Sequence, residues 1–460
     1  MAVENCSTEY IDKVVEAQRA LFRSGVTLDI DFRKRMLKRL LEALKMWEKP
    51  LTDALWQDLH KSYEEAYMTE ISILFGEIRY HLKHLASWAA PKRVSAPLKM
   101  FPSRSRIVSE PLGNTLIIAP WNYPVQLLLN PLVGAISAGC TAILKPSPYV
   151  PNVSHVLEQM IDFAFEENYV AIVQGNRDVN RYLLDKRFDL IFFTGSPVLG
   201  RQVMEAAAKN LTPVVLELGG KSPCIVDKEA NIKVAAKRIA WGKSLNAGQT
   251  CIAPDYLLVH QDVKEQFVAE LQKAFRSLLG KNPQKTKHFV HIVSDKAFDR
   301  LVGYLDNGVI RFGGEHLRDE RFIAPTLLDN VAPDAPVMQE EIFGPIFPLL
   351  TFTERSEAIK FVTEREKPLA LYYFGTTENG QEVLRNISSG GACINDVIMH
   401  IANEKAPFGG VGNSGMGAYH GEESFKVFSH RKTVVSTTTR IDMPFRYMPY
   451  RIFGLIKKLM

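Results

Sequence analysis

The sequence predicts an α/β fold with two open, doubly wound sheets and a small β extension. Three observations support this prediction. Beyond Pro111, short apolar runs alternate with helical stretches, which is the order that produces βαβ units. The runs are rich in Val, Ile, Leu and Phe and lack polar alternation, as is typical of strands buried on both faces of a parallel sheet. The 460 residues are enough for two or three domains.

The first ninety residues are predicted to be helical. Apolar residues recur there at the spacing of one helix face, at Met36, Leu37, Leu40, Leu41 and Leu44. Similar spacing continues through Leu51–Trp56 and Ile71–Ile78. We interpret these helices as packing elements without a chemical role.

Five apolar runs predict the strands of the first sheet, namely Thr115–Ala119, Ala142–Leu144, Val170–Val173, Leu190–Phe193 and Val214–Leu216. A second α/β region is expected from about Gly220 to Asn403, with strands at Ile225–Val226 and Tyr256–Val259 and a helix at Val263–Leu279. The Val- and Thr-rich segment Lys432–Thr439 is predicted to be an edge strand.

Polar or glycine residues directly follow four of the runs in the first sheet. They are Pro120-Trp121-Asn122, Lys145-Pro146-Ser147, Thr194-Gly195-Ser196 and Glu217-Leu218-Gly219-Gly220. In open α/β sheets, ligands bind outside the carboxyl ends of the strands. We therefore expect four segments that are distant in sequence to contribute to one rim.

Composition excludes several classes of protein. The net charge of +5 and the absence of a long Lys/Arg run argue against a nucleic-acid binder. Five scattered cysteines without a CxxC pair argue against a metal site or a disulfide framework and favour a reducing compartment. The charged N-terminus does not resemble a signal peptide, and no uncharged run reaches the ~20 residues of a membrane span. The expected location is the cytoplasm.

Cys251 and Glu217 are the candidate reactive residues. Cys251 lies in an irregular loop between Gly248 and Pro254, where a thiol can be accessible, although burial statistics alone favour an inert buried thiol. Glu217 directly follows a predicted buried strand. It is either a solvated strand end or a general base that can reach a bound water.

The segment Gly195-Ser196-Pro197 follows a predicted strand and opens a helix that includes Gly200. Ser196 is a good N-cap and Pro197 suits the first helical position. Free N–H groups at such a helix start favour a phosphate, although helix capping alone explains these residues.

Two glycine-rich patterns fail as nucleotide-binding motifs. A formal G-x-G-x-x-G at Gly410, Gly412 and Gly415 does not follow a predicted strand. The Gly-Lys-Ser triplets at Gly220 and Gly242 lack the first P-loop glycine. Neither pattern predicts a nucleotide site by itself.

Together, the motifs resemble the aldehyde dehydrogenase superfamily over nearly the whole chain. The matching stretches occur in the family's order and spacing: Ala119–Pro124, Lys145–Ser147, Phe193–Ser196, Glu217–Lys221, Gly248–Cys251, Glu341–Pro345 and Pro407–Gly410. Ile394–Val397 and Gly415–Gly421 resemble the class 3 branch, which acts on fatty and aromatic aldehydes and tends to form dimers. The resemblance therefore implies an aldehyde substrate, a homodimer and no metal site.

The resemblance also implies residue roles. Cys251 is the expected nucleophile, Asn122 and the Cys251 backbone N–H the expected oxyanion donors, and Glu217 the expected base that activates water against a thioester. The expected cofactor is NAD or NADP, bound by Lys145, Gly195, Ser196, Gly200, Glu341, Phe343 and Trp121, with Phe408 framing the pocket. Family members bind the dinucleotide without the usual fingerprint, so its absence agrees with the resemblance.

The expected domains follow from the same comparison. Residues 1–218, with 404–424 returning to them, form a Rossmann-like cofactor domain, and residues 219–403 form the catalytic domain. Segments 98–112 and 425–442 are expected to be bridging, oligomerising strands, and 443–460 a C-terminal tail. The tail mixes aromatic and basic residues, which suits either a membrane surface or packing on the protein's own surface or across the dimer.

Three rival interpretations and one departure from the family pattern remain. The first rival is an acylating, coenzyme A-dependent enzyme, but such relatives generally lack the base at Glu217. The second is a binding or structural protein on a retired enzyme scaffold, which would not keep Cys251, Asn122 and Glu217. The third is a thiol hydrolase, which would need a histidine beside Cys251.

Many NAD-preferring members carry a glutamate where this chain has Pro148. Since that glutamate would repel a 2′-phosphate and no arginine is evident beside Pro148, we expect use of both cofactors.

Overall fold

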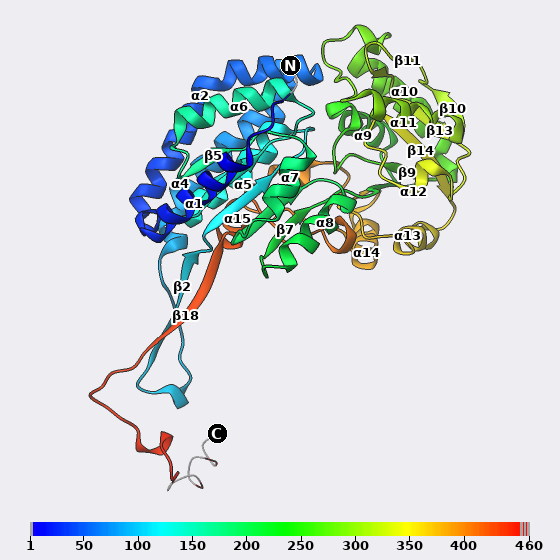
Figure 1. Cartoon of the computed structure of the whole chain (residues 1–460). Coiled ribbons are helices and arrows are strands. Elements are labelled where there is room, and N and C mark those ends of the chain that lie inside the picture. Colours follow the sequence, from blue (N-terminus) through cyan, green and yellow to red (C-terminus); the bar gives the residue numbers. More distant parts are fainter. Residues whose placement is uncertain (1–2, 451–453, 455–456, 458–460) are drawn as a thin grey trace.

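The computed structural model describes residues 3–450 together with Gly454 and Lys457. Two lobes lie side by side, and an arm of strands projects from the lobe that contains the N-terminus (Figure 1). Each lobe is built on one open sheet, so the predicted α/β class with two open sheets and a small β extension is confirmed.

The first sheet has six strands in the order β17-β7-β6-β3-β4-β5. All neighbouring pairs are parallel except β17, which runs antiparallel to β7. The five predicted runs form its parallel strands, and the sixth strand comes from far along the chain. The bounds are β3 (Asn114–Ile118), β4 (Thr141–Lys145), β5 (Val170–Ile172), β6 (Leu190–Thr194), β7 (Val214–Glu217) and β17 (Gly415–Met416).

Helices cover both faces of this sheet, as the βαβ order requires. The chain begins with the predicted N-terminal helices α1 (Thr8–Arg23), α2 (Ile30–Leu59), α3 (Tyr63–Ala66), the π-helical turn η2 (Tyr67–Ile71) and α4 (Ser72–Ala89). The crossover and return helices are α5 (Pro124–Ala138), α6 (Pro151–Ala164), α7 (Arg177–Leu184), α8 (Pro197–Ala208) and α15 (Gly421–Val427). Every residue of α5 is buried, because α2, α4 and α15 pack against it.

The second sheet has seven strands in the order β10-β13-β14-β9-β8-β15-β16, parallel except at β10. Its strands are β8 (Pro223–Val226), β9 (Tyr256–His260), β10 (Val309–Phe312), β13 (Thr326–Asp329), β14 (Ile346–Phe352), β15 (Ala370–Phe374) and β16 (Gly391–Ile394). Its helices are α9 (Ile232–Ser244), α10 (Lys264–Leu279), α11 (Asp295–Val302), α12 (Pro336–Gln339), α13 (Arg355–Thr363) and α14 (Thr377–Asn386), and a hairpin joins β11 (His316–Leu317) to β12 (Phe322–Ile323).

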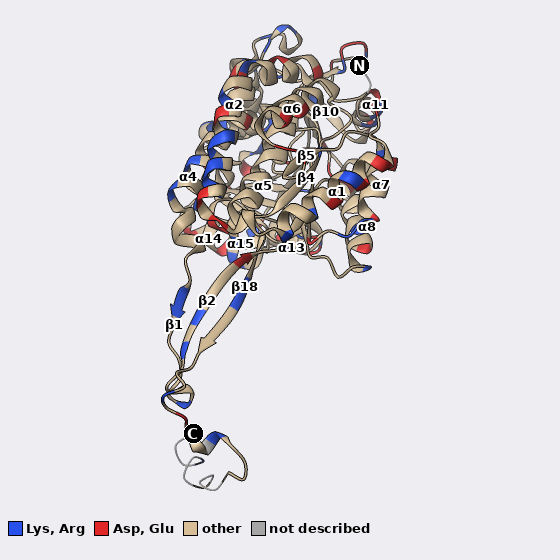
Figure 2. Cartoon of the chain, turned by 60° about the vertical axis from the view of Figure 1, so that its left-hand side comes forward, with Lys and Arg blue, Asp and Glu red and all other residues tan. Residues whose placement is uncertain are grey.

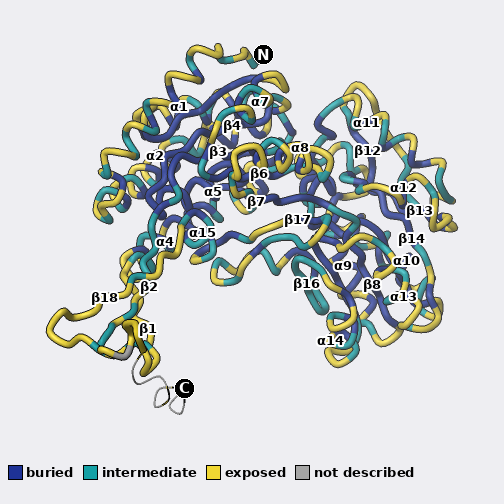
Figure 3. The backbone as a smooth tube through the Cα atoms, turned by 60° about the horizontal axis from the view of Figure 1, so that its bottom comes forward, coloured by how far each residue is buried: buried dark blue, intermediate teal, exposed yellow. Residues whose placement is uncertain are grey.

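The arm consists of three antiparallel strands, β1 (Lys92–Val94), β2 (Arg104–Pro111) and β18 (Ser429–Ser436). The predicted edge strand is β18, and it pairs with β2 along its whole length. Lys and Arg residues are frequent on these strands (Figure 2). Figure 3 shows buried residues concentrated in the two sheets, whereas the outer part of the arm is exposed. The arm therefore contributes little to the core of its own chain.

The described part of the chain contains no helix that is both long and apolar enough to cross a lipid bilayer. The C-terminal tail leaves the outer end of the arm (Figure 1). Residues 451–453, 455–456 and 458–460 of the predicted tail lie outside the described residues.

Candidate active site

A cavity of about 1120 Å³ lies at the carboxyl ends of β3, β6 and β7 and extends to the second lobe. Its wall includes all three predicted catalytic residues, Cys251, Glu217 and Asn122. Five of the predicted cofactor-binding residues also line it, namely Trp121, Gly195, Ser196, Glu341 and Phe343. The structure thus gathers residues from both sheets around one space.

Glu217 ends β7, where it is hydrogen-bonded into the sheet on both sides. Its register partners are Thr194 on β6 and Gly415 on β17. The side chain is 3 % exposed, and neither carboxylate oxygen has a hydrogen-bond partner among the described residues. Burial raises the pKa of Glu217 well above its ordinary value. The ionised form of such a carboxyl group is a stronger base than an exposed carboxylate, so it can take a proton from a molecule in the cavity.

Cys251 follows a tightly turned segment between α9 and β9. Asn246 and Ala247 both adopt left-handed backbone conformations, with φ of 51° and 50°. Gly248 follows with φ of 72°, and a Cβ atom there would lie 2.4 Å from the Gly344 carbonyl oxygen, so only glycine fits. Consecutive left-handed residues are strained and must be held by their surroundings.

The thiol of Cys251 is half-buried in the cavity wall. Burial raises its pKa, and the negative charges of Glu341 and Glu217 raise it further. The resting side chain is consequently a thiol and not a thiolate. Nucleophilic attack then requires transfer of the thiol proton to a neighbouring base.

Asn122 lies in the bend after β3 and is 2 % exposed. Its amide nitrogen donates a hydrogen bond to the Gln249 carbonyl oxygen, 3.1 Å away. A side-chain amide has two N–H groups, so one remains for an oxygen atom of a ligand in the cavity. The Gln249 contact fixes the amide beside the loop that carries Cys251.

The residues expected to hold the nicotinamide end of a dinucleotide form one wall. The rings of Trp121 and Phe343 lie 5.4 Å apart at 83°. Glu341 Oε1 is buried without a partner among the described residues, and Glu341 Oε2 leaves no room for a side chain at Gly219. A free carboxylate oxygen beside aromatic rings fits a ribose hydroxyl next to a planar ring.

The segment that carries Glu341 is fixed from the second lobe. Arg300 donates to the carbonyl oxygens of Glu341 at 3.2 Å and Ile342 at 2.7 Å, and Asp255 accepts from the Ile342 N–H at 2.8 Å. Lys221 forms an ion pair with Asp255. Removal from water raises the pKa of Glu341 to about 8, and the charge of Asp255 adds to this shift.

The N-terminus of α8 supplies the expected phosphate site. Ser196 is the N-cap, and its hydroxyl accepts from the Leu199 N–H at 3.4 Å. Pro197 takes the first helical position, as expected from the sequence. Ser196, Pro197 and Val198 line the cavity, and the backbone N–H groups of Ser196 and Val198 at this helix start fit a pyrophosphate.

Two predicted cofactor residues lie elsewhere. Lys145 ends β4, is 1 % exposed, and donates to the Pro146 carbonyl oxygen at 2.7 Å. Gly200 lies inside α8, where a Cβ atom would meet the Leu218 side chain at 2.7 Å. Neither residue lines the cavity. Gly200 permits close packing of α8 on the segment after β7, and Lys145 remains a proposed ribose contact one strand farther along the sheet.

Comparisons with known proteins identify the family. The sequence pattern described as "Aldehyde dehydrogenase family" matches residues 1–434. The 4,4′-diaponeurosporen-aldehyde dehydrogenase of Staphylococcus aureus is 48 % identical over 436 residues, which cover 94 % of this chain and 95 % of that protein. The chain belongs to the aldehyde dehydrogenase family. It is therefore an oxidoreductase that oxidises aldehydes.

A second relative and a solved structure extend the comparison. The "aldehyde dehydrogenase, dimeric NADP-preferring" of Canis lupus familiaris is 42 % identical over 421 residues, covering 91 % of this chain and 93 % of that protein. A solved structure described as the substrate-bound state of Staphylococcus aureus AldH superposes with a TM-score of 0.96 at 47 % identity, covering 98 % and 99 % of the two chains. The resemblance stated from the motifs is thus confirmed.

A second, smaller cavity of this aldehyde dehydrogenase corrects the expectation that no arginine lies beside Pro148. Its wall consists of Pro148, Tyr149, Asn176, Arg177, Asp178 and Arg181. Arg177 begins α7, which follows β5, the strand next to β4. The sequence could not show this neighbourhood, because only the pairing of β4 with β5 brings the two segments together.

Sequence reasoning also missed the contribution of the N-terminal helices, which we interpreted as packing elements only. Lys61, Glu65 and Glu70 are buried, and they contact the segments that carry Asn122 and Cys251. The sequence contained one indication that these helices do more than pack. Glu70 precedes Leu74 by four residues, so a charged side chain occupies the apolar face of the helix.

The glycine-rich segment that failed as a dinucleotide fingerprint has a different place in the fold. Gly412 begins a short 3₁₀ turn, and Gly415 begins β17. A Cβ atom at Gly415 would lie 2.4 Å from the Leu216 carbonyl oxygen. Phe408, expected to frame the pocket, is buried and its ring lies 5.9 Å from that of Tyr419. The lack of a side chain at Gly415 thus allows β17 to pair closely with β7 beside Glu217.

Proposed function

We propose that this chain oxidises an aldehyde to a carboxylic acid through a thioester on Cys251, with NAD or NADP as the hydride acceptor. The observation that supports this most directly is the convergence of Cys251, Glu217 and Asn122 on one cavity, with both Glu217 oxygens free of partners among the described residues. A nucleophile, an amide donor and a base are the groups that the reaction needs.

In the first step, the Cys251 sulfur attacks the aldehyde carbon while the thiol proton passes to a neighbouring carboxylate. The carbonyl oxygen becomes negatively charged in the thiohemiacetal. The free N–H of the Asn122 amide and the Cys251 backbone N–H stabilise this oxyanion, since donors fixed in a buried site need no reorganisation.

A bound dinucleotide would supply the hydride acceptor, and loss of the hydride from the thiohemiacetal carbon would leave a thioester on Cys251. Trp121, Phe343 and Glu341 would hold its nicotinamide end, and the first turn of α8 its pyrophosphate. Glu217 then takes a proton from water, the hydroxide adds to the thioester carbon, and the Cys251 thiolate leaves with formation of the acid. The raised pKa of Glu217 makes it a stronger base for this step.

The substrate is proposed to be a medium-chain, long-chain or aromatic aldehyde. The names of similar proteins support a lipophilic substrate, since the Staphylococcus aureus relative is named for 4,4′-diaponeurosporen-aldehyde. The test is a panel of aldehydes from short aliphatic to long-chain and aromatic, with reduced cofactor followed by absorbance, with and without coenzyme A. We expect turnover without coenzyme A, and one ¹⁸O atom from labelled water in the acid. A requirement for coenzyme A would contradict the proposed hydrolysis.

A homodimer is the proposed assembly. The arm exposes Val94 and Val435, which the strand register places on either side of Ser105, so both valines lie on one face of the arm. The dog relative is named as dimeric. An open strand edge beside exposed apolar side chains is a surface on which another chain can pair, which supports a second copy as the partner.

A peripheral membrane contact of the tail is a second candidate. Leu98 and Phe101 at the outer end of the arm and Tyr447, Met448 and Tyr450 in the tail are exposed. Basic residues accompany them, as in interfacial segments. Liposome co-sedimentation of the full chain and of a chain truncated at Met443 tests this contact, and equal partitioning would exclude it.

We also propose the division into domains that the resemblance implies. The cofactor domain comprises residues 1–218 with 404–424, the catalytic domain comprises residues 219–403, and the arm is separate from both.

A further inference from the structure

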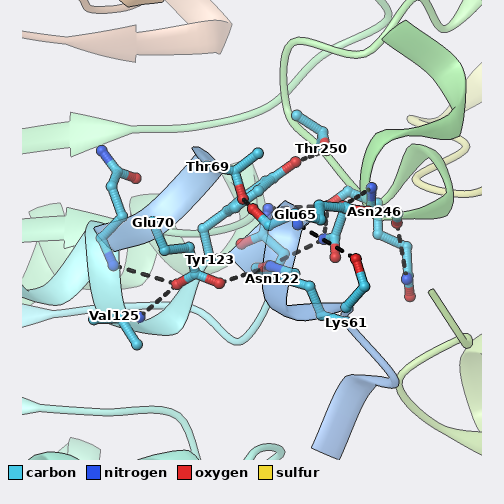
Figure 4. Close-up of polar contacts among 12 residues, drawn as sticks. Lys61, Glu65, Thr69, Glu70, Asn122, Tyr123, Val125, Asn246 and Thr250 are labelled. Carbon is cyan, nitrogen blue, oxygen red and sulfur yellow. Dashed lines mark hydrogen bonds and ion pairs between the residues drawn. The ribbon is translucent and has the colours of Figure 1, made fainter. Parts of the chain in front are cut away.

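Three buried ionic side chains, Lys61, Glu65 and Glu70, join the segment of Asn122 to the loop of Cys251. We call them the anchor cluster. Figure 4 shows them in one set of polar contacts with Asn122, Tyr123, Val125, Asn246 and Thr250. The cluster comes from the region between α2 and α4, which contributes no residue to the cavity wall.

Lys61 binds the Asn122 segment directly. Its ammonium group, which is fully buried, lies 2.7 Å from Glu70 Oε1 and donates to the Asn122 carbonyl oxygen at 3.0 Å. It also lies 4.2 Å from the centre of the Tyr123 ring. Two consecutive residues of the segment after β3 are therefore in contact with one cation.

Glu70 holds the same segment from its other end. Its second oxygen accepts from the backbone N–H groups of Val125 at 2.8 Å and Gln126 at 3.3 Å. These N–H groups belong to the first turn of α5, which has no partner within the helix for them. The Lys61–Glu70 pair consequently fixes both the bend that contains Asn122 and the start of α5 that follows it.

Glu65 holds the loop of the nucleophile. Its carboxylate accepts from the Asn246 N–H at 2.7 Å, at the first of the two strained left-handed residues. The Asn246 amide in turn donates to the carbonyl oxygens of Asn122 at 3.0 Å and Gln249 at 2.9 Å. Tyr123 and Thr250 add a hydrogen bond of 2.7 Å between their hydroxyl groups.

A buried ion pair of this kind does little for stability by itself. Desolvation of two charges offsets most of their attraction, and well-packed neutral side chains often serve as well. What apolar side chains cannot supply is the set of directed hydrogen bonds to Asn122, α5 and Asn246. The geometry thus favours a positional role over a stabilising one.

We propose that Lys61, Glu65 and Glu70 are positioning residues, which hold the Asn122 amide and the Cys251 thiol in the mutual arrangement that oxyanion stabilisation requires. The inference rests on the proposed function, since it presumes that Asn122 binds the oxyanion. Small displacements of such groups slow a reaction strongly, by about 100-fold for a shift of 1 Å.

The test combines Lys61→Met/Glu70→Gln with Asn122→Ala in a double-mutant cycle. Removal of both charges together avoids an unpaired buried ion, and the glutamine retains an oxygen for the α5 N–H groups. We expect the single-turnover rate of aldehyde oxidation to fall about 10- to 100-fold in the otherwise unchanged chain. In the Asn122→Ala background the same pair should change the rate less than about threefold, because the positioned group is already gone. The dissociation constant for NADP, measured without aldehyde, should not change.

The cycle separates the two proposals. A normal rate in Asn122→Ala alone would contradict the oxyanion role and thus the proposed function. A slow Asn122→Ala enzyme in which the anchor variants still cause their full loss would overturn the positioning role only. Lys264→Met is the control, because it breaks a partly buried ion pair of 2.8 Å with Asp329 that is remote from the cavity wall, and it should leave the rate unchanged.

A second pair of variants covers the case in which the charge-free pair does not fold. Burial raises the pKa of Glu65 to about 7, so the neutral form already occurs near neutral pH. Glu65→Gln keeps the oxygen that accepts the Asn246 N–H and should retain the parent rate, whereas Glu65→Ala should lose at least about tenfold. Equal rates in these two variants would overturn the proposal.

Discussion

Glu217 lies opposite Gly415 in the antiparallel pair of β7 and β17, and its carboxyl group lines the cavity that also contains Cys251. Both of its oxygens are free of partners among the described residues. From this placement we predict that Glu217→Gln slows hydrolysis of the thioester more than hydride transfer. Rapid mixing with aldehyde should give a burst of reduced cofactor followed by a slow steady state. Equal loss of both phases would mean that Glu217 acts earlier, on the thiol itself.

Cys251→Ser should abolish oxidation and leave cofactor binding intact. The thiol already has a raised pKa, and a serine hydroxyl, whose pKa is far higher, has no significant anionic fraction near neutrality. The change removes the nucleophile without altering the wall formed by Trp121 and Phe343. Titration of the variant with NAD or NADP provides the control. Turnover near the parent rate would contradict the assignment of Cys251.

Stability should fall as pH rises, because of Glu341. Removal from water raises the pKa of Glu341 to about 8, and Asp255 adds to the rise, so the unfolded chain loses this proton first, near 4.5, the ordinary pKa of a glutamate. As the pH rises between these two values, ionisation of Glu341 increasingly favours the unfolded state. Above about pH 8 the resulting loss in the free energy of unfolding levels off. Glu341→Gln should therefore increase Tm at pH 8 more than at pH 5. An equal shift at both values would contradict the raised pKa.

Both cofactors should be used, with Arg177 favouring NADP. Arg177 and Pro148 line the same small cavity, so an arginine is available for a 2′-phosphate while no glutamate repels it. A charge-assisted contact of about 1.5–3 kcal/mol predicts a loss of roughly 10- to 100-fold in kcat/KM for NADP in Arg177→Ala. The value for NAD should change little.

Pro148→Glu is the complementary variant. A glutamate there would repel the 2′-phosphate and accept a hydrogen bond from the 2′-hydroxyl, so the preference should move toward NAD. The comparison requires kcat/KM for both cofactors at saturating aldehyde. A preference of the unchanged enzyme for NAD by a thousandfold, about 4 kcal/mol, would contradict dual use.

The arm should determine the oligomeric state. Val94→Asp with Val435→Asp places two charges on the face of the arm that we propose is covered by a second copy. Sedimentation equilibrium should show a shift from dimer to monomer. Val309→Asp, on the outer strand of the second sheet, changes a similarly exposed valine and should leave the assembly unchanged. A monomeric unchanged chain would contradict the proposed dimer.

The parallel strands were predictable because each is a local run. Leu190–Phe193, for example, reappears as β6 with one residue added. Strand β17 was not predictable, since Gly415 and Met416 have no strand-like pattern and pair with β7 only through the tertiary fold. The fold class therefore followed from periodicity, whereas the closing strand did not.

The residues of the site also fall into a group that the sequence predicted and a group that it did not. Cys251, Glu217 and Asn122 stand in local motifs, and their common cavity follows from the rule that loops at one end of a parallel sheet meet. Lys61 and Arg177 act across contacts between segments far apart in sequence. Their neighbours could not be read from one sequence, because no local pattern specifies which helix packs beside which loop.

The position of β17 near the C-terminal end of the chain affects how the chain folds while it is synthesised on the ribosome. Strand β7 emerges early, but its outer edge stays open until residues 415–416 have been made, after the whole second sheet. During that interval a nascent strand edge is exposed to other chains, a situation that promotes misassembly. The first lobe cannot be completed before the second, so their folding is coupled in time. A nascent chain that stops before β17 should therefore depend on chaperones more than one that includes it.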